Sequence, residues 1–530
     1  MTAQLRDLKI QIGDAFKLNG LDLKIDAKRF IAEFLLKTTS DSNRKQCLAK
    51  LVEAILKQPL VSASVDLDTV KQAIKDCTQA SSDAEHALTV IAAYDVPVCE
   101  YVQERKKFVQ LSRQELDKRR CFFGTAEDKA AFYRTRYTVI HQRLLRHKVF
   151  AALTMAGLDD STRIELRTVE SLLGAGNFEG EEVVVFGMLT QLKEDKFFLE
   201  DPTGHIQLNL QESPRYYVPG LYTENCMLLV QAVCKDKILT VKAVCHPPAE
   251  KAEQTRISFG DVNFFGGNAG AKKSTKLHQL ECENSDGFFV ILSDVWLDRI
   301  NVLESLERLF QGYSQFPPIG FIFCGNFLSE PHGFQQFENF ANGFEKLAAI
   351  LSKFPTLLEQ SQFIFVPGIQ DPILSDILPR PPLPGSLVAP MLSLKSGNFH
   401  FTTNPCRLQY CTQEIVIFRE DMIHKMCRNT IHMPSTQSEI PRHFVHSILC
   451  QSHLTPLPVH VCPVYWPLDH TLSIYPLPDL LIIADKFDPF TVSEFGCTVV
   501  NPGSFPNSNF AFKVYLPATR SVEDSILPQQ

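Results

Sequence analysis

The chain has 530 residues, and 45% of them are hydrophobic, which predicts a folded protein of roughly two to four domains with large apolar cores. Its 53 Lys and Arg against 60 Asp and Glu give a formal net charge of −7, which argues against a protein whose main task is to neutralise nucleic-acid phosphates. The 15 Cys form no Cys-x-x-Cys pair and indicate reduced thiols in the cytosol or nucleus. We expect neither a leader nor a membrane span, because the first turns are charged and no stretch approaches about 20 consecutive apolar residues.

Residues 1–77 predict a small helical module. Phe30, Ile31, Phe34 and Leu35 recur at helical spacing, and Pro59 ends a second helix that begins near Leu48. The module carries no nucleotide-binding loop, so we expect it to dock to other proteins.

Residues 78–171 are predicted to be a helical connecting region with uneven charge. Cations and aromatic rings are interleaved there, as in surfaces that contact phosphates and bases. Interspersed acidic residues dilute this charge, so we favour a pair of solvated helices whose rings pack inward. The cations and rings are Arg105, Lys106, Lys107, Arg113, Lys118, Arg119, Arg120, Arg134, Arg136, Arg143, Arg146, Lys148, Phe122, Phe123, Phe132, Tyr133 and Tyr137.

Residues 172–250 change to the spacing of strands and predict a small closed barrel of OB-fold type. Strands are expected at 182–190, 196–210, 227–233 and 238–244, with a hairpin turn at Asp201-Pro202-Thr203-Gly204. Rings of the barrel could stack on single-stranded DNA. Few Lys and Arg accompany them, so we favour rings that fill the barrel or meet the next domain. The candidates are Phe186, Phe197, Tyr216, Tyr217 and Tyr222.

Residues 251–284 are predicted to be a flexible linker. The run from Gly266 to Ser274 is similar to a phosphate-binding loop, but Ala271 stands where the second Gly is needed. Lys273 stands where the Mg²⁺-binding hydroxyl is needed, and no apolar strand precedes the run.

Residues 285–530 contain five short apolar runs that predict buried strands, each ending at a polar or Gly-bearing turn. Helical faces follow the first two, which favours a sandwich of two sheets flanked by helices. The runs are 288–292, 320–324, 362–366, 480–483 and 498–500. Because α/β sheets build sites where strands end, the candidate positions follow these runs. They are Asp294, Trp296, Gly325, Asn326, Gly368, Gln370, Asp485 and Phe487.

These strand ends resemble, in order, the motifs of the calcineurin-like metallophosphoesterases: Asp-x-His, Gly-Asp, Gly-Asn-His, Gly-His-x-His and Asn-Pro-Gly-Ser. The frame is present, but Trp296, Asn326, Gln370 and Phe487 stand at positions where the family has metal ligands. A two-metal hydrolase needs about six to eight His, Asp and Asn ligands. The resemblance therefore implies a degenerate fold with no catalytic residue, no metal site and no cofactor.

A phosphoesterase frame without its ligands, preceded by an OB-type barrel, is similar to the B subunits of eukaryotic replicative DNA polymerases. The elements at 263–267 and 475–486 strengthen the resemblance, which covers nearly the whole chain. It implies a multi-domain α/β and β protein: an N-terminal helical module similar to the lid of AAA+ ATPases, an OB-fold barrel and an inactive calcineurin-like αββα sandwich.

The resemblance also implies a function, that of a non-catalytic accessory subunit in nuclear DNA replication. Its partners would be the cysteine-rich C-terminal module of the polymerase's catalytic subunit, small histone-fold subunits of the same complex and components of the replicative helicase. Two alternatives stay open, a divergent metal-dependent phosphodiesterase or nuclease and a single-stranded DNA-binding module with a weak DNA contact.

One cluster of His and Cys could suggest zinc. His443, His446, Cys450 and His453 lie along three helical turns, and His460, Cys462 and His470 follow. Ligands strung along one helix cannot converge on one ion. We therefore predict an ordinary helix whose buried stripe is Phe444, Val445, Ile448 and Leu449.

Overall fold

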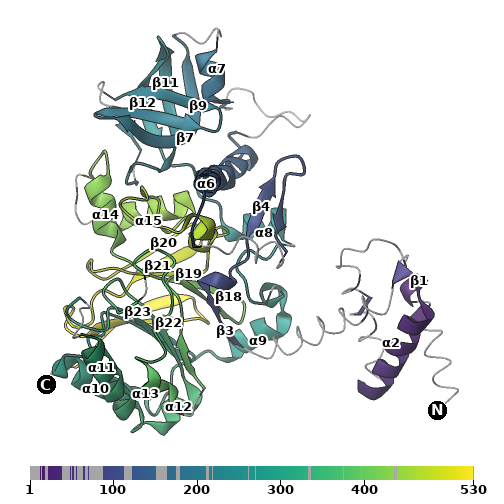
Figure 1. The fold of residues 1–530 in the computed structure, drawn as a ribbon, viewed down its shortest axis with the longest axis vertical. Coiled ribbons are helices and arrows are strands. Elements are labelled where there is room, and N and C mark those ends of the chain that lie inside the picture. The colour runs from purple at the N-terminus through teal and green to yellow at the C-terminus, as the bar shows by residue number, and fades with distance from the viewer. Residues whose placement is uncertain are drawn as a thin grey trace. The chain divides into compact units, whose positions relative to one another are not determined.

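The computed structural model of the chain describes most residues from 87 onward and a selection before that (Figure 1). The chain divides into two compact units, residues 1–87 and 88–530, and each is described by itself. Among the described residues, no helix has the length and apolar character needed to cross a membrane. The described residues are 12–13, 15–17, 22–38, 48, 51–52, 55, 64–65, 70, 87–112, 122–150, 164–174, 180–210, 214–217, 219–260, 262–268, 270–331, 336–373, 375–394, 397–434, 436 and 439–528.

The first unit is built on α2 (Ile25–Thr38) and a parallel pair of short strands, β1 (Asp22–Leu23) and β2 (Ser64–Val65). Ile31 is fully buried, which confirms the apolar face predicted for this helix; the side chains of Phe34 and Leu35 lie outside the description. Residues of the second predicted helix join the same core, namely Leu48, Leu51, Val52 and Ile55.

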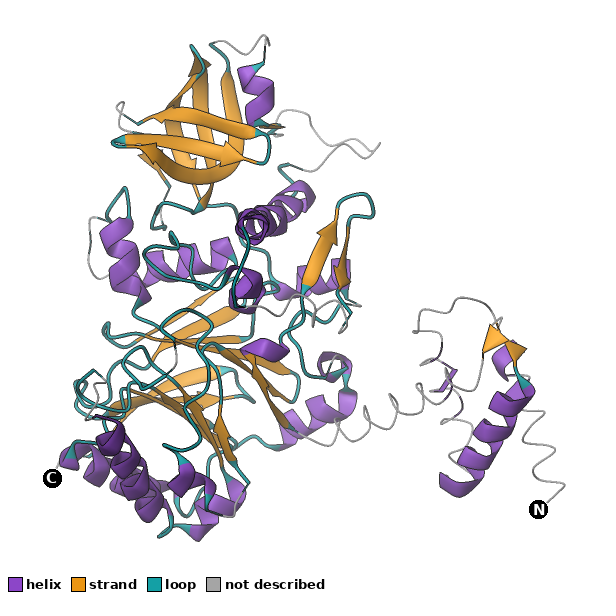
Figure 2. Ribbon diagram, viewed as in Figure 1, coloured by secondary structure: helices purple, strands orange, loops and turns teal. Residues whose placement is uncertain are grey.

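A closed barrel forms where the strand spacing predicts one (Figure 2). Its strands follow the order β10-β12-β11-β7-β8-β9, and parallel pairing of β12 with β9 closes it. The predicted turn is confirmed, because the Asp201 carboxylate accepts hydrogen bonds from the backbone N–H groups of Thr203 (2.8 Å) and Gly204 (3.0 Å). The elements are β6 (Leu166–Arg167), α7 (Val169–Leu173), β7 (Glu182–Lys193), β8 (Lys196–Asp201), β9 (Gly204–Asn209), β10 (Arg215–Tyr216), β11 (Met227–Lys235) and β12 (Ile238–Cys245).

The region between the first unit and the barrel differs from the predicted pair of solvated helices. It holds one long helix, α6 (Ala126–Arg146), and a hairpin of β4 (Cys99–Val102) and β5 (Lys107–Gln110). It also holds β3 (Leu88–Ala92), which pairs with β17 far along the chain and is followed by the 3-10 turn η1 (Ala93–Asp95). The helical prediction is wrong there because the alternating residues of a short edge strand carry little signal until their partner strand is known.

Two six-stranded mixed sheets make up the rest of the second unit. The first runs in the order β16 (Phe399–Phe401), β15 (Gln362–Val366), β14 (Gly320–Cys324), β13 (Phe289–Ser293), β22 (Ala511–Leu516), β23 (Ser521–Ile526). The second runs in the order β20 (Phe490–Glu494), β21 (Cys497–Asn501), β19 (Leu480–Ala484), β18 (Gln413–Arg419), β17 (Cys406–Tyr410), β3. All five predicted buried strands are therefore confirmed, and they are shared between two sheets.

Alternating side chains of β13 show how the layers pack. Val290 and Leu292 join the apolar core beneath α10 and α11, whereas Phe289 points to the second sheet and meets the Tyr410 ring edge-on at 5.4 Å between centroids. The outer face of the second sheet packs against α15, through Phe444 among others. The helices are α10 (Ile300–Tyr313), α11 (Gln336–Leu351), α12 (Pro355–Gln360), α13 (Ala389–Leu392), α14 (Met422–Asn429), α15 (Ile440–Gln451) and the 3-10 helix η5 (Trp466–Leu472).

The segment predicted to be a flexible linker is instead folded onto the second sheet. It contains α8 (Ala252–Phe259), the 3-10 turn η3 (Ala271–Lys273) and α9 (Thr275–Glu283). The Gln409 side chain of β17 holds Asn268, accepting from its N–H at 2.9 Å and donating to its carbonyl at 3.0 Å. Glycine and lysine in a sequence suggest a mobile segment, but here contacts to a distant strand hold the segment in place.

The barrel is joined to α15 by buried polar contacts. Gln451 accepts from the Met227 N–H and donates to its carbonyl, both at 2.8 Å. The same amide donates to His246 (3.1 Å), a ring stacked on Tyr222. Burial lowers the pKa of His246 to about 3, and nearby His446 adds to the shift, so His246 is neutral at this junction.

Gly187 of β7 provides a test of the barrel packing. A Cβ at this position would lie 2.8 Å from the Glu200 carbonyl oxygen and 2.8 Å from Leu199 Cγ. We expect Gly187→Ala to lower the free energy of unfolding by about 1–3 kcal/mol, measured by urea denaturation. Gly312→Ala is the matched control, since a Cβ there meets nothing within 4 Å, and it should be neutral or stabilising by up to about 1 kcal/mol.

The buried histidines predict that the fold loses stability in mild acid. The pKa values of His246, His453 and His470 are all lowered, chiefly by burial, so below about pH 6.5 the unfolded chain takes up protons that the folded chain does not. Stability should fall as the pH drops from 7 toward 4, by up to about 1.4 kcal/mol per pH unit for each proton.

Denaturant titrations at several pH values measure this slope. His246→Asn should make the slope shallower, whereas the same change at exposed His205 should leave it as it is. Equal slopes for all three proteins would contradict the assignment of His246.

Candidate functional site

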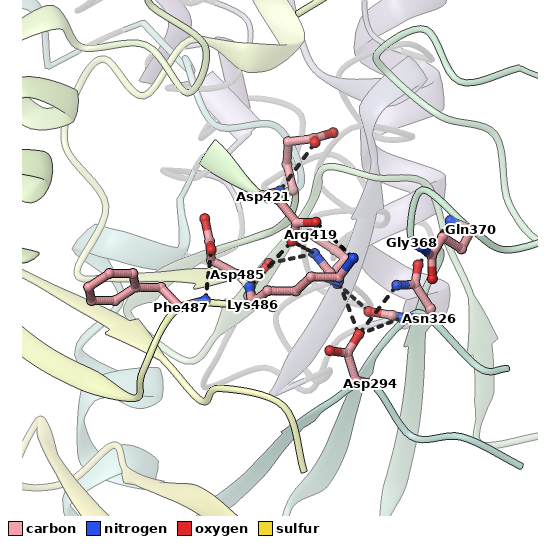
Figure 3. Close-up of polar contacts among 12 residues, drawn as sticks. Asp294, Asn326, Gly368, Gln370, Arg419, Asp421, Asp485, Lys486 and Phe487 are labelled. Carbon is pink, nitrogen blue, oxygen red and sulfur yellow. Dashed lines mark hydrogen bonds and ion pairs between the residues drawn. The ribbon is translucent and has the colours of Figure 1, made fainter. Parts of the chain in front are cut away.

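The carboxyl ends of strands from both sheets meet around one side chain, Arg419 at the end of β18 (Figure 3). Its guanidinium donates to the Asp294 carboxylate after β13 (3.0 Å) and to the Asp421 carboxylate (2.8 Å). It also donates to the carbonyls of Gly325 after β14 and Ala484 at the end of β19. One buried cation therefore contacts four of the segments that close the sandwich.

Arg419 remains charged at this place although its side chain is only 1% exposed. Burial opposes the charge, but the carboxylates of Asp294 and Asp421 outweigh it and raise the pKa of the guanidinium above its ordinary value. Asp294 has a left-handed backbone with φ of +57°, and it is 2% exposed.

Asn326 links Asp294 to the third strand end. Its N–H (3.1 Å) and its side-chain amide (3.4 Å) both donate to Asp294 Oδ1. Its own Oδ1 accepts from the backbone N–H of Gln370 at 2.9 Å. The predicted positions Asp294, Asn326 and Gln370 are thus brought together, although Gln370 contributes its backbone to this contact.

Asp371 is a carboxylate that the candidate positions missed. It is fully buried and accepts from the N–H groups of Phe327 and Gly368, both at 2.7 Å, so it ties the ends of β14 and β15 together. Burial raises the pKa of Asp371 to about 6, against the effect of these donors and of Arg419. Gly325 and Gly368 leave room for this contact, because a Cβ on either would collide with the other loop.

Asp485 has a local structural role. Its carboxylate accepts from the N–H of Ile423 in the first turn of α14 and from that of Phe487, both at 2.9 Å. Burial raises the pKa of Asp485 as well. An acceptor at a helix N-terminus satisfies N–H groups that the helix itself leaves unpaired.

The two remaining candidates point elsewhere. Phe487 packs against the apolar core of the second sheet, and Figure 3 shows its ring directed away from Asp294. Trp296 packs against the core of the first sheet. Neither side chain offers a lone pair to the cluster around Arg419.

A second buried ion pair lies next to the backbone of Arg419. Arg380 pairs with Glu420 and donates to the Arg419 carbonyl at 3.1 Å. Asn404 holds the Arg419 backbone on both sides, since it accepts from the N–H at 3.0 Å and donates to the carbonyl at 2.7 Å. The guanidinium is therefore placed by a fixed backbone.

The donor set at these strand ends does not fit a pair of divalent cations. Asp294 is engaged by Arg419, Asp371 and Asp485 accept from backbone N–H groups, and Asn326 accepts from Gln370. Among the described residues, no three His, Cys, Asp or Glu side chains are grouped so that they could hold one ion. A buried guanidinium beside Asp294 would also repel a metal ion.

His443, His446 and Cys450 lie on an ordinary helix, as predicted, whereas His453 lies beyond its end at Gln451. Phe444, Val445, Ile448 and Leu449 are buried along α15. His443 contacts the backbone of Gly220 (2.9 Å). His446 lies 3.0 Å from Glu494 and 3.4 Å from Cys450 Sγ. Burial raises the pKa of Cys450 to about 12, so this thiol is not an activated nucleophile.

The aromatic candidates of the barrel are mostly packed inside the second unit. Phe186 is 2% exposed and lies against Tyr137 of α6 at 4.9 Å between ring centroids. Tyr222 is fully buried, and Tyr216 stacks on His432 at 4.2 Å. Phe197 packs on the barrel core, and Tyr217 is the most open of the five at 45% exposure.

Three of the basic residues of α6 are used inside the protein, whereas Lys129 and Arg134 are exposed. Arg136 forms an ion pair with Asp469 (2.7 Å), and Arg143 donates to the Cys450 carbonyl (2.7 Å). Arg146 pairs with Glu250 at 2.7 Å. These cations bind α6 to neighbouring segments, which differs from the predicted solvated helices. Arg105, Lys106, Lys107, Arg134 and Lys148 are exposed, and so are the rings of Phe122 and Phe123, which were predicted to pack inward. Arg113, Lys118, Arg119 and Arg120 lie outside the described residues.

Three family models match consecutive parts of the chain. The first, described as DNA polymerases epsilon N terminal, matches residues 4–77. The second, DNA polymerase epsilon subunit 2-like, OB-fold domain, matches 126–248, and the third, which describes the B subunit of DNA polymerase alpha/epsilon, matches 289–492. The barrel, the two sheets and these matches define the class of the protein, a B subunit of a DNA polymerase.

Curated relatives narrow the class. DNA polymerase epsilon subunit 2 of Mus musculus is 47% identical over 98% of both chains. That of Homo sapiens is 46% identical over 97% of both, and that of Drosophila melanogaster is 37% identical over 100% of both. The chain belongs to the DNA polymerase epsilon subunit 2 family.

Replacing Arg419 tests its importance. We expect Arg419→Met to lower the free energy of unfolding by about 3–5 kcal/mol, measured by urea denaturation, because Asp294 would stay buried without its cation. Adding Asp294→Asn should recover part of the loss, since no charge would then remain unpaired.

Arg442→Met is the matched control. This side chain is 65% exposed and lies 3.6 Å from Glu494, so its loss should cost less than about 1 kcal/mol. A loss for Arg419→Met no greater than that of the control would contradict the role given to Arg419.

Proposed function

We propose that this chain, by its family an accessory subunit of DNA polymerase epsilon, acts as a non-catalytic scaffold. The observation that carries the proposal is the position of Arg419, whose guanidinium fills the place where strand ends of both sheets converge and engages Asp294. Shape and surface, rather than bond-breaking chemistry, are then what the second unit offers a partner.

The two-sheet body is, in this proposal, a calcineurin-like phosphoesterase sandwich that has lost its ligands. Asp294, Trp296, Gly325 and Asn326 are the degenerate positions after the first two strands. After the later strands the degenerate positions are Gly368, Gln370, Asp485 and Phe487. A positive side chain in place of metal ions lets the remaining carboxylate stay buried without binding a cation, so no metal or cofactor is required.

The partners follow from the family. The barrel and the two-sheet body would hold the cysteine-rich C-terminal module of the catalytic subunit. Residues 1–77 would reach other replication proteins, including the small histone-fold subunits and components of the replicative helicase. A nuclear location follows from a role in DNA replication.

The two alternative functions have less support from the described residues. A metal-dependent phosphodiesterase or nuclease would need ligands free to bind ions, whereas Asp294 is engaged by Arg419, and Asp371 and Asp485 accept from backbone N–H groups. A single-stranded DNA platform would need open rings with unpaired cations, whereas Phe186 and Tyr222 are buried and Arg136 and Arg143 are engaged inside the protein.

Co-expression tests the scaffold. The full chain, produced together with the cysteine-rich C-terminal fragment of the polymerase epsilon catalytic subunit, should elute from gel filtration as a one-to-one complex. A fragment of the catalytic subunit that lacks this module is the control and should elute separately. Separate elution of two folded proteins in both cases would overturn the scaffold proposal.

Turnover tests the loss of catalysis. The purified chain with Mn²⁺ or Fe²⁺ should hydrolyse neither bis-nitrophenyl phosphate nor single-stranded DNA above the rate of its Asp294→Asn variant. The control is Asp286→Asn, a change at an exposed residue. A metal-dependent rate that disappears in Asp294→Asn but persists in Asp286→Asn would instead support the enzyme alternative.

A further inference from the structure

A large cavity lies away from the convergent strand ends, between the outer face of the second sheet and the segment formed by α8, η3 and α9. Its volume of about 880 Å³ falls in the upper part of the range of ligand pockets, about 300–1,000 Å³. Its lining comes from β17, β18 and residues 251–279, together with parts of 473–479, 495–496 and Arg520. We refer to it as the α8–α9 cavity.

The wall of this cavity is built by specific contacts. Gly266 and Gly267 have positive φ angles of +94° and +63°, and a Cβ on Gly267 would lie 2.9 Å from Gln409 Oε1. The Gln409 amide and the Asn268 backbone hold each other through two hydrogen bonds. The glycines of this run thus have a structural role, because they allow its backbone to lie close against β17.

The lining of the cavity carries more positive than negative charge. Six lining side chains are Lys or Arg, and three are Asp or Glu, whereas the whole chain has a net charge of −7. The cations are Lys251, Arg256, Lys272, Lys273, Arg407 and Arg520, and the acidic residues are Glu253, Glu414 and Asp479.

The buried part of the cavity keeps this excess. Arg407 is 5% exposed and its guanidinium donates to the carbonyls of Phe264 (3.0 Å), Phe265 (3.2 Å) and Ser473 (2.8 Å). Burial lowers the pKa of Arg407 to about 10, so it stays charged at neutral pH. The charge of Glu414 raises the pKa of Arg407, but Glu414 itself is paired with Arg256 at 2.5 Å.

Cations also outnumber carboxylates around Asp479, because this one carboxylate forms ion pairs with both Lys272 and Arg520. Aromatic rings complete the lining, among them Phe264, Tyr475 and Phe495. Rings beside cations favour a ligand that combines carboxylates with an apolar side chain.

We propose that the α8–α9 cavity binds a short acidic peptide segment of a protein partner, anchored by an apolar residue among the rings. The inference goes beyond the scaffold proposal and does not depend on it, since it rests on this cavity alone. Nucleic acid fits less well, because every nucleotide carries a phosphate, whereas a peptide can place acidic residues beside the cations and uncharged residues beside Glu253, Glu414 and Asp479.

Fluorescence anisotropy with the full chain tests the proposal. The probes are a short fluorescein-labelled peptide with Asp and Glu flanking a central Phe-Leu, its counterpart with Lys in place of the acids, and a labelled oligothymidylate of similar length. We expect the acidic peptide to bind, more tightly at low than at moderate salt, and the other two to bind at least about tenfold more weakly.

Charge-reversal variants localise the site. Lys251→Glu combined with Lys273→Glu should weaken the acidic peptide by at least about tenfold, because both residues line the cavity. Lys276→Glu is the control, since this exposed residue of α9 lies outside the lining, and it should change affinity by less than about threefold.

Circular dichroism of the variants verifies their fold. The proposal is overturned if the acidic peptide does not bind, if both peptides bind alike, or if the control weakens binding as much as the double variant. Tight oligothymidylate binding that the double variant abolishes would instead assign the cavity to nucleic acid.

Discussion

The ion pair between Arg419 and Asp294 is the interaction on which the two-sheet body depends. It joins the end of β18 in one sheet to the end of β13 in the other, and the same guanidinium reaches the carbonyls of Gly325 and Ala484. Burying a cation and a carboxylate costs free energy unless every donor and acceptor finds a partner. Here the cost is offset because Arg380, Asn404 and Asn326 complete the hydrogen bonds around the pair.

The same principle extends through the second unit. Arg136 and Arg143 of α6 are buried and Arg146 is partly buried, and all three pair with carboxylates or carbonyls of distant segments. Neutral His246 and Gln451 join the barrel to α15. Some cations that look like a surface patch in the sequence thus serve as internal connections, whereas Arg105, Lys106, Lys107, Arg134 and Lys148 of the same region are exposed.

Prediction from the sequence succeeded where the signal is local. The strands at β13, β14, β15, β19 and β21 are short apolar runs whose residues are buried on both faces, so their type does not depend on the neighbours. The Asp201 turn and the apolar stripe of α15 are equally local. The candidate positions Asp294 and Asn326 were found because they directly follow such runs.

Prediction failed where a distant partner decides. Arg419 ends a strand of apolar residues, Ile415–Val416–Ile417–Phe418, and that is its only signal; nothing nearby shows that it lies beside Asp294, which is 125 positions away. Strand β3 forms by pairing with β17, and the glycine-rich run at 266–270 is held in place by Gln409. The sequence shows that Asp371 follows a buried strand, but it does not show that this carboxylate is itself buried.

The sequence by itself determined the secondary structure of the core strands and the residue types that stand at the strand ends, because these follow from residue type and short-range spacing. Only the tertiary structure decided which charge occupies the convergent strand ends, which cations are internal, and where a positively charged cavity opens. Electrostatic energy depends on distance and burial, and both are set by residues that the chain brings together from far apart.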